Sequence, residues 1–147
     1  MKRQISVGLL LAVGLLSWGA AHPEQAWSDN SCSLQTLKGI YLYHCAGVQV
    51  VNGQPVHFAF AGKDHYHGDG TMSGVYSLSD NGALSHYVSY TGTYTVNPDC
   101  TGAFSTVDEN GVAIHADLFF ERDGEEVNFV LTDSGVVDAG VERRVHK

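Results

Sequence analysis

Basic side chains are scarce in this sequence of 147 residues, in which 8 lysines and arginines stand against 16 aspartates and glutamates. The resulting net charge of −8 excludes a nucleic-acid binder, because an acidic surface repels phosphates. Proline is also rare, with 3 residues, whereas there are 17 glycines and 7 tyrosines. Since a hydrophobic content of 44% is too high for a disordered chain, these numbers favour one compact domain of strands and tight turns.

Long hydrophobic runs are lacking beyond the first 21 residues. Lys2 and Arg3 precede an apolar run at 5–16, and small residues follow at 19–21. This order is typical of a secretory signal peptide, and the run is shorter than the ~18 apolar residues that a membrane span needs. We expect cleavage after Ala21, with an uncleaved anchor as the alternative.

Cleavage would give an exported protein, periplasmic or extracellular, with no stable membrane span. Removal of Lys2 and Arg3 leaves 6 basic and 16 acidic side chains, a formal net charge of −10. We expect a short N-terminal segment at residues 22–31 and a single domain at residues 32–147. The oligomeric state is not predicted.

Seven turn signals divide this domain into eight segments. Asn-Gly and Asp-Gly pairs tolerate the positive φ of type I′ turns, which join antiparallel strands. The signals are Asn52-Gly53, Asp69-Gly70, Asn81-Gly82, Asn97-Pro98-Asp99, Asn110-Gly111, Asp123-Gly124 and Asp133-Ser134-Gly135. They predict strands at residues 37–47, 55–62, 70–79, 83–96, 101–107, 112–121, 125–132 and 136–145.

Eight consecutive antiparallel strands favour an all-β, up-and-down barrel, because closure removes both exposed edges of the sheet. A two-sheet sandwich with the same strands is the alternative. The interior of an eight-stranded barrel is either filled by side chains or wide enough for one small ligand.

The sixth and seventh predicted strands alternate between an aliphatic face and a mixed face. Polar residues usually face outward in antiparallel sheets, so we expect the mixed face on the surface. With the opposite parity it would line the interior, where a carboxyl group of raised pKa could act as general acid or base. Under that alternative the candidate catalytic residues are Glu126, His115 and Asp117, and the candidate ligand contacts are Phe119 and Asn128.

Aromatic side chains from five predicted strands are numerous enough to line a pocket, with tyrosine hydroxyls to orient a ligand. The alternative is that these rings fill a solid core. The candidate ligand-binding residues are Tyr41, Tyr43, Phe58, Phe60, Tyr76, Tyr90, Tyr94 and Phe104.

Histidines at alternate positions of a strand point the same way, so His65 and His67 could both reach one metal ion. His115 and Asp117 repeat this spacing. A cupin would add a nearby glutamate, but none follows here, and Asp69 belongs to a turn. The chain also lacks a Ser-His-Asp order, a phosphate loop and a nucleophile elbow. We therefore expect neither a metal site nor a cofactor.

Three segments resemble a family of secreted, largely uncharacterised bacterial β-barrel proteins. They are CSLQTLKGIY at 32–41, GTYTVNPDCTG at 92–102 and TDSGVVDAG at 132–140, and the resemblance covers residues 32–145. The barrel of that family is similar to that of allene oxide cyclases, a calycin-like architecture whose members include cofactor-free cyclases of small apolar molecules. The resemblance implies a calycin-like barrel, and no catalytic motif of the plant cyclases matches positions here.

Three cysteines in an exported protein leave one unpaired. Cys32 and Cys100 lie in the resembled segments, so the resemblance implies a disulfide between them. Cys45 is then interpreted as a small buried side chain. A reactive nucleophile at Cys45 and a Cys32–Cys45 disulfide are the alternatives.

Together, these observations predict an exported barrel that binds a small apolar or aromatic molecule without a cofactor. A cofactor-free cyclase or isomerase acting on such a molecule inside the barrel is one alternative. It would need an ionisable or strongly polar group in the cavity, whereas a carrier would not. A structural exported domain with a filled core is the second alternative.

Overall fold

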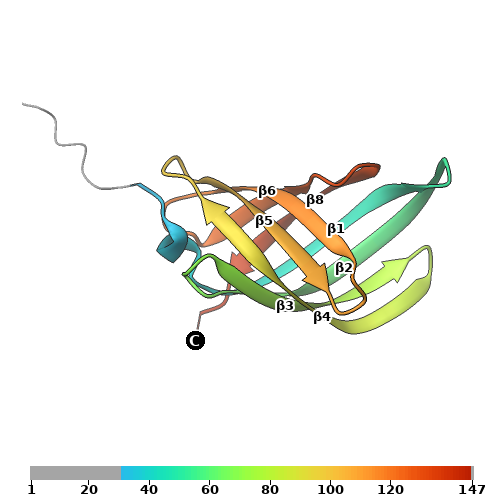
Figure 1. The fold of residues 1–147 in the computed structure, drawn as a ribbon, viewed down its shortest axis with the longest axis horizontal. Coiled ribbons are helices and arrows are strands. Elements are labelled where there is room, and N and C mark those ends of the chain that lie inside the picture. Colours follow the sequence, from blue (N-terminus) through green and yellow to red (C-terminus); the bar gives the residue numbers. More distant parts are fainter. Residues whose placement is uncertain (1–30, 147) are drawn as a thin grey trace, which may run out of the picture.

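The computed structural model describes residues 31–146. The expected signal peptide and residues 22–30 lie outside the described residues. Within the described part, one short 3-10 helix precedes eight strands (Figure 1). The elements are η1 (Leu34–Leu37), β1 (Gly39–Val51), β2 (Gln54–Tyr66), β3 (Thr71–Asp80), β4 (Ala83–Val96), β5 (Thr101–Asp108), β6 (Ala113–Phe120), β7 (Glu126–Leu131) and β8 (Val136–Arg144).

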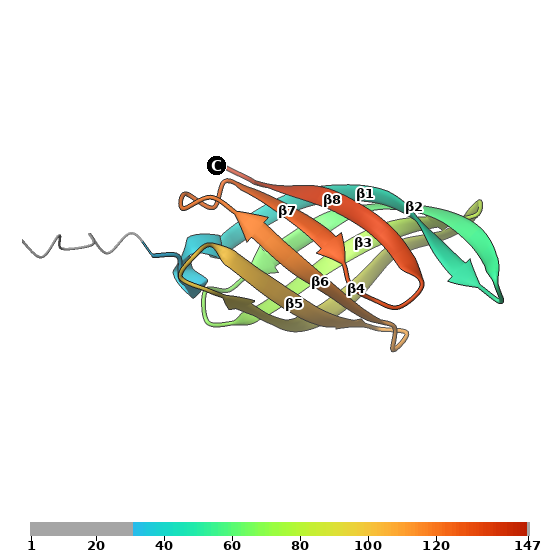
Figure 2. The same cartoon turned by 90° about the horizontal axis from the view of Figure 1, so that it is seen from above.

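Each strand pairs antiparallel with its neighbours in the sequence, and β1 also pairs with β8. Tyr43 of β1, for example, lies opposite Gly62 of β2 and opposite Glu142 of β8. The sheet therefore closes on itself, as the wrapped ribbons of Figure 2 show. The predicted up-and-down barrel is confirmed, and the two-sheet sandwich is excluded.

All seven predicted turns fall between observed strands. Asn52 and Gly53 both have positive φ, of 51° and 75°, as a type I′ hairpin turn requires. The strand bounds differ most in β1, which was expected at residues 37–47 and continues to Val51, and in β2, which was expected to end at residue 62. β2 continues to Tyr66, because residues 63–66 keep pairing with both β1 and β3.

The aliphatic face of β6 and β7 points into the barrel. Its residues, from Ala116 to Phe120 on β6 and from Val127 to Leu131 on β7, are buried at every second position. Burial of this apolar surface stabilises the fold by roughly 25 cal/mol per Å², which fixes the register of both strands. The expected parity is confirmed, and the mixed face is exposed.

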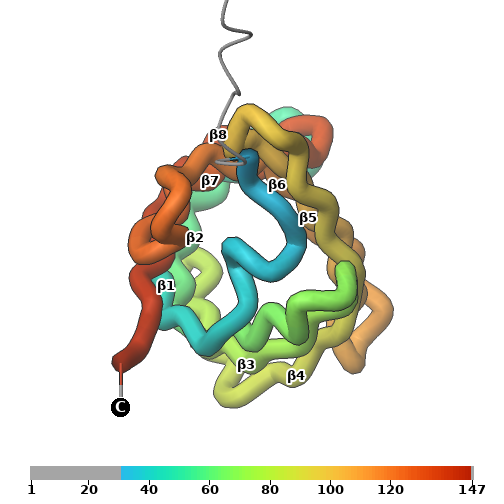
Figure 3. The backbone as a smooth tube through the Cα atoms, turned by 90° about the vertical axis from the view of Figure 1, so that its left-hand side faces the viewer, coloured from blue at the N-terminus to red at the C-terminus, as the bar shows by residue number. Residues whose placement is uncertain are grey.

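One end of the barrel is closed by η1. Figure 3 shows the segment that contains it crossing the barrel opening. The side chain of Leu37 is completely buried there. The backbone oxygen of Leu34 accepts a hydrogen bond of 2.9 Å from the Tyr94 hydroxyl, and Gln35 donates one of 2.8 Å to the oxygen of Gly68. The helix thus forms a plug attached to β4 and to the β2–β3 turn.

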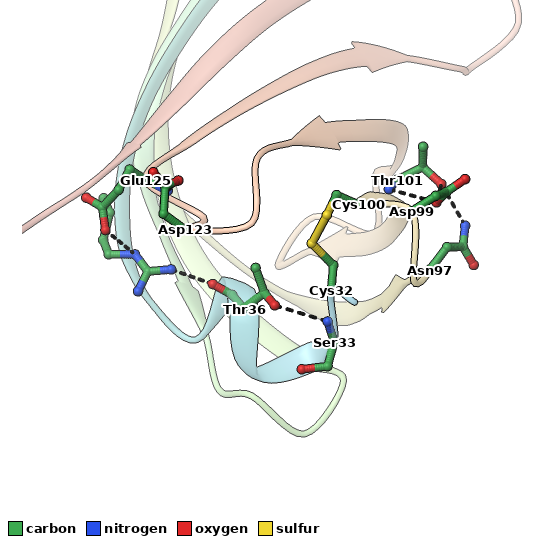
Figure 4. Close-up of a disulfide and its surroundings, with 10 residues drawn as sticks. Cys32, Ser33, Thr36, Asn97, Asp99, Cys100, Thr101, Asp123 and Glu125 are labelled. Carbon is green, nitrogen blue, oxygen red and sulfur yellow. Dashed lines mark hydrogen bonds and ion pairs between the residues drawn. A yellow bond between two sulfur atoms is a disulfide. The ribbon is translucent and has the colours of Figure 1, made fainter. Parts of the chain in front are cut away.

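Two further links hold the plug. The disulfide Cys32–Cys100, implied by the resemblance, joins the segment before η1 to the β4–β5 turn (Figure 4). On the other side, the guanidinium of Arg144 donates to the backbone oxygen of Thr36 and to the Tyr41 hydroxyl.

No helix in residues 31–146 is long and apolar enough to cross a membrane.

Candidate ligand-binding cavity

A cavity of about 240 Å³ occupies the barrel beyond the plug. It extends toward the β5–β6 and β7–β8 turns, at the end opposite η1. All strands contribute side chains to it. The lining residues are Tyr43, Gln49, Phe58, Phe60, Asp64, Tyr76, Leu78, Tyr90, Phe104, Thr106, Val112, Ala113, Ile114, Phe129, Leu131, Asp133, Val136 and Glu142.

Aromatic rings form a continuous wall of this cavity. Phe60 is at the centre of the wall, with ring centroids 5.9 Å from Tyr43, 5.8 Å from Phe58 and 6.1 Å from Tyr76. The Tyr76 ring is in turn 5.9 Å from that of Tyr90. Such separations are those of favourable aromatic pairs, so the rings hold one another in place.

Glycines on β2 and β3 create the space for two of these rings. A Cβ atom at Gly62 would lie 2.6 Å from the Tyr43 hydroxyl oxygen, and one at Gly74 would lie 2.2 Å from that of Tyr90. Both distances are far shorter than a van der Waals contact. Each tyrosine can therefore lie over the glycine that faces it on the neighbouring strand, and the two hydroxyl groups are 3.2 Å apart.

Two carboxyl groups, Asp64 and Glu142, are buried in the depth of the cavity. Asp64 on β2 is 3% exposed and Glu142 on β8 is 1% exposed. The Tyr90 hydroxyl donates a hydrogen bond to Asp64, and the Tyr66 hydroxyl lies 3.1 and 3.2 Å from the two carboxylate oxygens of Glu142. The acids thus meet where β1 separates β2 from β8 in the closed sheet.

Burial in this apolar site changes the acidity of both groups. It raises the pKa of Asp64 to about 7, although the hydrogen bonds from Tyr90 and Glu142 act in the opposite direction. Burial and the negative charge of Asp64 raise the pKa of Glu142 well above its usual range. The groups titrate as a pair, and the pair holds a proton near neutral pH. Burial likewise raises the pKa of Tyr66, which stays protonated as a donor.

The candidate ligand-binding residues separate into three groups. Most of them line the cavity: Tyr43, Phe58, Phe60, Tyr76, Tyr90 and Phe104. Tyr41 and Tyr94 are buried instead at the closed end, where their ring centroids lie 5.3 and 4.9 Å from that of Tyr66. Phe119 and Asn128 point out of the barrel, because they have the parity opposite to that of the buried aliphatic residues.

The candidate catalytic residues also lie outside the barrel. Glu126 forms an exposed ion pair with Arg143 at 3.0 Å, and the His115 ring lies 2.7 Å from Asp133. Asp117 is exposed. The idea that these three residues act on a molecule in the interior is therefore wrong, since an inward position would require the aliphatic face of β6 and β7 to face water.

His65 and His67 are exposed neighbours whose ring centroids lie 4.3 Å apart. Partial burial and the charges of His67 and Lys63 lower the pKa of His65. Residues 31–146 contain no group of three or more histidine, cysteine or acidic side chains placed to hold a metal ion.

The free cysteine, Cys45, is buried on β1. Burial and the adjacent Asp138 carboxylate raise the pKa of its thiol, which disfavours the thiolate needed by a nucleophile. The disulfide uses Cys32 and Cys100, so the Cys32–Cys45 alternative is excluded.

Sequence reasoning missed Asp64 and Glu142 as interior groups. Asp64 has the same parity as Phe58 and Phe60, which were expected to point inward. Because β2 was expected to stop at residue 62, that parity was not carried on to Asp64. Glu142 could have been found in the same way from the alternation of β8.

Comparison of the chain with models of protein families and with curated proteins gave no match. Several solved structures share its fold. The redesigned β-barrel b11L5F_LGL has a TM-score of 0.56 at 16% identity, over 81% of this chain and 100% of that one. The redesigned β-barrel mFAP1, solved bound to DFHBI, has a TM-score of 0.54 at 15% identity, over 76% and 98% of the two chains.

EF1p2_mFAP2b, also bound to DFHBI, gives a TM-score of 0.54 at 12% identity, over 80% of this chain and 100% of that one. At these identities the similarity concerns the fold alone. The chain is a closed, calycin-like barrel of eight antiparallel strands.

Proposed function

We propose that this protein binds a small apolar or aromatic molecule inside its barrel. The observation that carries the proposal is the aromatic-walled cavity of about 240 Å³, in a barrel of which η1 closes one end. An apolar cavity of about 150 Å³ is enough to hold benzene, so the space here suits a larger aromatic molecule. Two barrels of the same fold, mFAP1 and EF1p2_mFAP2b, were solved bound to DFHBI, which supports small-molecule binding by this fold.

The same proposal includes the export of the protein and its relationship to a family of barrel proteins. The charged N-terminus followed by an apolar run supports secretion. The segments at 32–41, 92–102 and 132–140 support membership of the secreted bacterial barrel family and a relationship to the allene oxide cyclase barrel. A disulfide is typical of proteins in oxidising compartments, in agreement with this interpretation.

A cofactor-free isomerase or cyclase acting in the same cavity is the second candidate. It is favoured by the Asp64–Glu142 pair, because a carboxyl group with a pKa near 7 is suited to proton transfer at neutral pH. Incubation of small aryl ketones with the protein in D₂O would test it. General acid–base catalysis predicts exchange at the α-carbon, seen by NMR and lost in Asp64→Asn; no exchange above the buffer rate would exclude this chemistry for such ketones.

Binding itself can be tested with a neutral fluorescent probe, N-phenyl-1-naphthylamine. Ile114→Trp would fill the cavity from β6, whereas Val107→Trp adds the same ring on the exposed face of β5. We expect strong fluorescence enhancement with the wild type and Val107→Trp, and at least a tenfold loss of affinity in Ile114→Trp. Equal affinity for all three proteins would show that the probe binds elsewhere and would contradict the proposal. Native mass spectrometry of protein taken from its exported compartment would then show whether a natural ligand co-purifies.

A further inference from the structure

We infer that the cavity selects an organic cation: a protonated amine on an aromatic or apolar body, with its ammonium group between Asp64 and Glu142. This inference rests on the proposed binding function and specifies the class of ligand. It follows from three properties of the interior: its acidic groups without a basic partner, the faces of its aromatic rings, and the number of hydrogen-bond acceptors in its depth.

The acidic groups of the cavity have no basic partner within it. Asp64 and Glu142 line it together with Asp133, which is bonded to His115 outside the cavity, and none of the lining side chains is lysine, arginine or histidine. Arg144 follows Glu142 on the inner face of β8, but its guanidinium is bound to the plug, to Tyr41 and to Glu125. A buried negative charge without a partner is costly, and a cationic ligand would remove that cost.

A third interior acid, Asp138, strengthens this argument. It is 5% exposed and lies on the inner face of β8 between Val136 and Glu142, which both line the cavity. Neither of its carboxylate oxygens has a hydrogen-bond partner within residues 31–146. The neighbouring Cys45 thiol is only a weak donor. Asp138 therefore adds negative potential to the interior that no described group neutralises.

Another interior acid, Asp108, shows what a satisfied carboxylate looks like in this barrel. It accepts hydrogen bonds of 2.7 Å from the Tyr76 hydroxyl and of 2.8 Å from the backbone N–H groups of Asn110 and Val112. These donors give Asp108 a structural role beside the β5–β6 turn. Asp64 and Glu142 receive one tyrosine hydroxyl each and share a hydrogen bond with each other, so their remaining lone pairs can accept further donors.

The ring faces suit a cation better than they suit an anion. Tyr43, Phe60 and Tyr90 surround the depth of the cavity, and the electron-rich faces of such rings attract a cation within about 6 Å. An ammonium group has three N–H donors. The Asp64 carboxylate, the Glu142 carboxylate and the Tyr43 hydroxyl oxygen supply three acceptors for them.

A set of probes of similar shape can separate the effect of the ligand's charge on affinity from the effect of its shape. We would measure binding of 2-phenylethylamine, 2-phenylethanol and phenylacetate to the wild-type protein by calorimetry at pH 8. The inference predicts that the amine binds at least tenfold more tightly than the alcohol and that phenylacetate does not bind. Equal or tighter binding of the alcohol would overturn the inference and leave the proposed binding function intact. Failure of all three probes, together with failure of N-phenyl-1-naphthylamine, would overturn both.

Variants of the acids provide the second measurement. In Asp64→Asn/Glu142→Gln, which preserves shape, we expect the preference for the amine to fall to less than threefold while the alcohol still binds. Glu126→Gln is the matched control, because it makes the same change on the exposed face of β7. A preference that survives in the double variant would place the ammonium elsewhere and contradict the assignment. If the double variant does not fold, the ¹⁵N chemical shift of labelled amine bound to the wild type decides whether it is held protonated.

Discussion

The closed end of the barrel and the depth of its cavity both depend on tyrosines, but their hydroxyl groups have different partners. At the closed end Tyr41 donates to the backbone oxygen of Gly124 at 2.6 Å, and Tyr94 donates to that of Leu34. At the cavity, the lining residue Tyr90 donates to Asp64, and Tyr66, which packs against Tyr41 and Tyr94, donates to Glu142. Groups whose hydrogen bonds satisfy one another, including the Arg144 guanidinium at Tyr41, make a stable plug, whereas buried acids with few donors make a site that can still accept hydrogen bonds. The contrast assigns stability to one end and recognition to the other.

Loss of the disulfide should have the largest effect on the closed end. Cys32 and Cys100 are separated by 68 residues, and closing a loop of this length stabilises a fold by up to about 4 kcal/mol in the chain-entropy model. Cys32→Ser/Cys100→Ser should lower the free energy of unfolding in urea by up to this amount. Cys45→Ala, which leaves the bridge intact, should lose stability on addition of reducing agent as the wild type does, whereas the double serine variant should not respond to it. A wild-type protein equally stable with and without reductant would contradict this role.

The plug residue Leu37 should give the next largest effect. Leu37→Ala removes a completely buried side chain, and such changes cost about 2–5 kcal/mol. Leu42→Ala is the control, since Leu42 is 56% exposed and surface changes stay within about 0.5 kcal/mol. Thermal and urea unfolding followed by circular dichroism would measure both. Similar losses for the two variants would show that η1 does not contribute as a plug.

The cavity should respond to pH in a way that the closed end does not. The pKa of Asp64 is raised to about 7, so the folded state holds a proton that the unfolded chain releases near pH 4. The contribution of Asp64 to the free energy of unfolding is complete below about pH 4 and is lost as the pH rises through about 7. We expect the unliganded protein to lose on the order of 2 kcal/mol between pH 5 and pH 8, since one pKa unit corresponds to about 1.4 kcal/mol.

The acids with the opposite shift do not interfere in this window. Hydrogen bonds from Thr71 and Thr101 lower the pKa values of Asp69 and Asp99, and hydrogen bonds from Tyr76, Val112 and Asn110 outweigh burial and lower that of Asp108. The contributions of these three acids disappear only as the pH falls below about 4. Asp64→Asn/Glu142→Gln should flatten the pH dependence measured by urea unfolding. An unchanged slope in that variant would assign the titration to other groups.

Ligand affinity should show a smaller effect of opposite sign. The affinity for 2-phenylethylamine should rise about tenfold between pH 5.5 and 8, because the acids lose their proton while an alkylammonium with a pKa near 10 keeps its own. Tyr43, Tyr66 and Tyr90 also face the acids and stay protonated over this range, since burial raises their pKa values. Calorimetry with 2-phenylethanol serves as the reference, and a parallel rise for the alcohol would rule out charge as the cause.

The smallest effect is expected on the outer face. His115→Ala and Glu126→Ala remove exposed partners of Asp133 and Arg143, and exposed ion pairs contribute only about 0–1 kcal/mol. Probe affinity in the cavity should stay within twofold of the wild type for Glu126→Ala. A large loss there would mean that the outer face of β7 takes part in binding.

The architecture could be predicted from the sequence because the signals that specify it are local. Each Asn-Gly or Asp-Gly pair specifies a turn by its own backbone preferences, and the alternation in β6 and β7 specifies which face is buried. Most of the aromatic wall was found from the number of aromatic side chains on five predicted strands. The plug was harder to foresee, because η1 is a single turn whose position depends on the contacts of Tyr94 and Arg144, distant in sequence.

The acidic pair could not be found by a local argument. Asp64 and Glu142 are 78 positions apart and meet only because β8 closes against β1. The polar composition of residues 63–65 was also misleading, because Lys63, Asp64 and His65 together look like a solvated turn. Parity places Asp64 inside, but only once β2 is known to reach Tyr66.

The plug also determines how the barrel can be attached to other things. Residue 31 and residue 146, at the two limits of the described chain, lie at the end that η1 closes, while the cavity extends toward the opposite end (Figure 1). A tether or fusion partner joined at either limit would therefore leave the mouth of the cavity facing away from the attachment point. Immobilised through its N-terminal side, the domain would present every mouth to the solution, the orientation that capture of a small molecule on a surface requires.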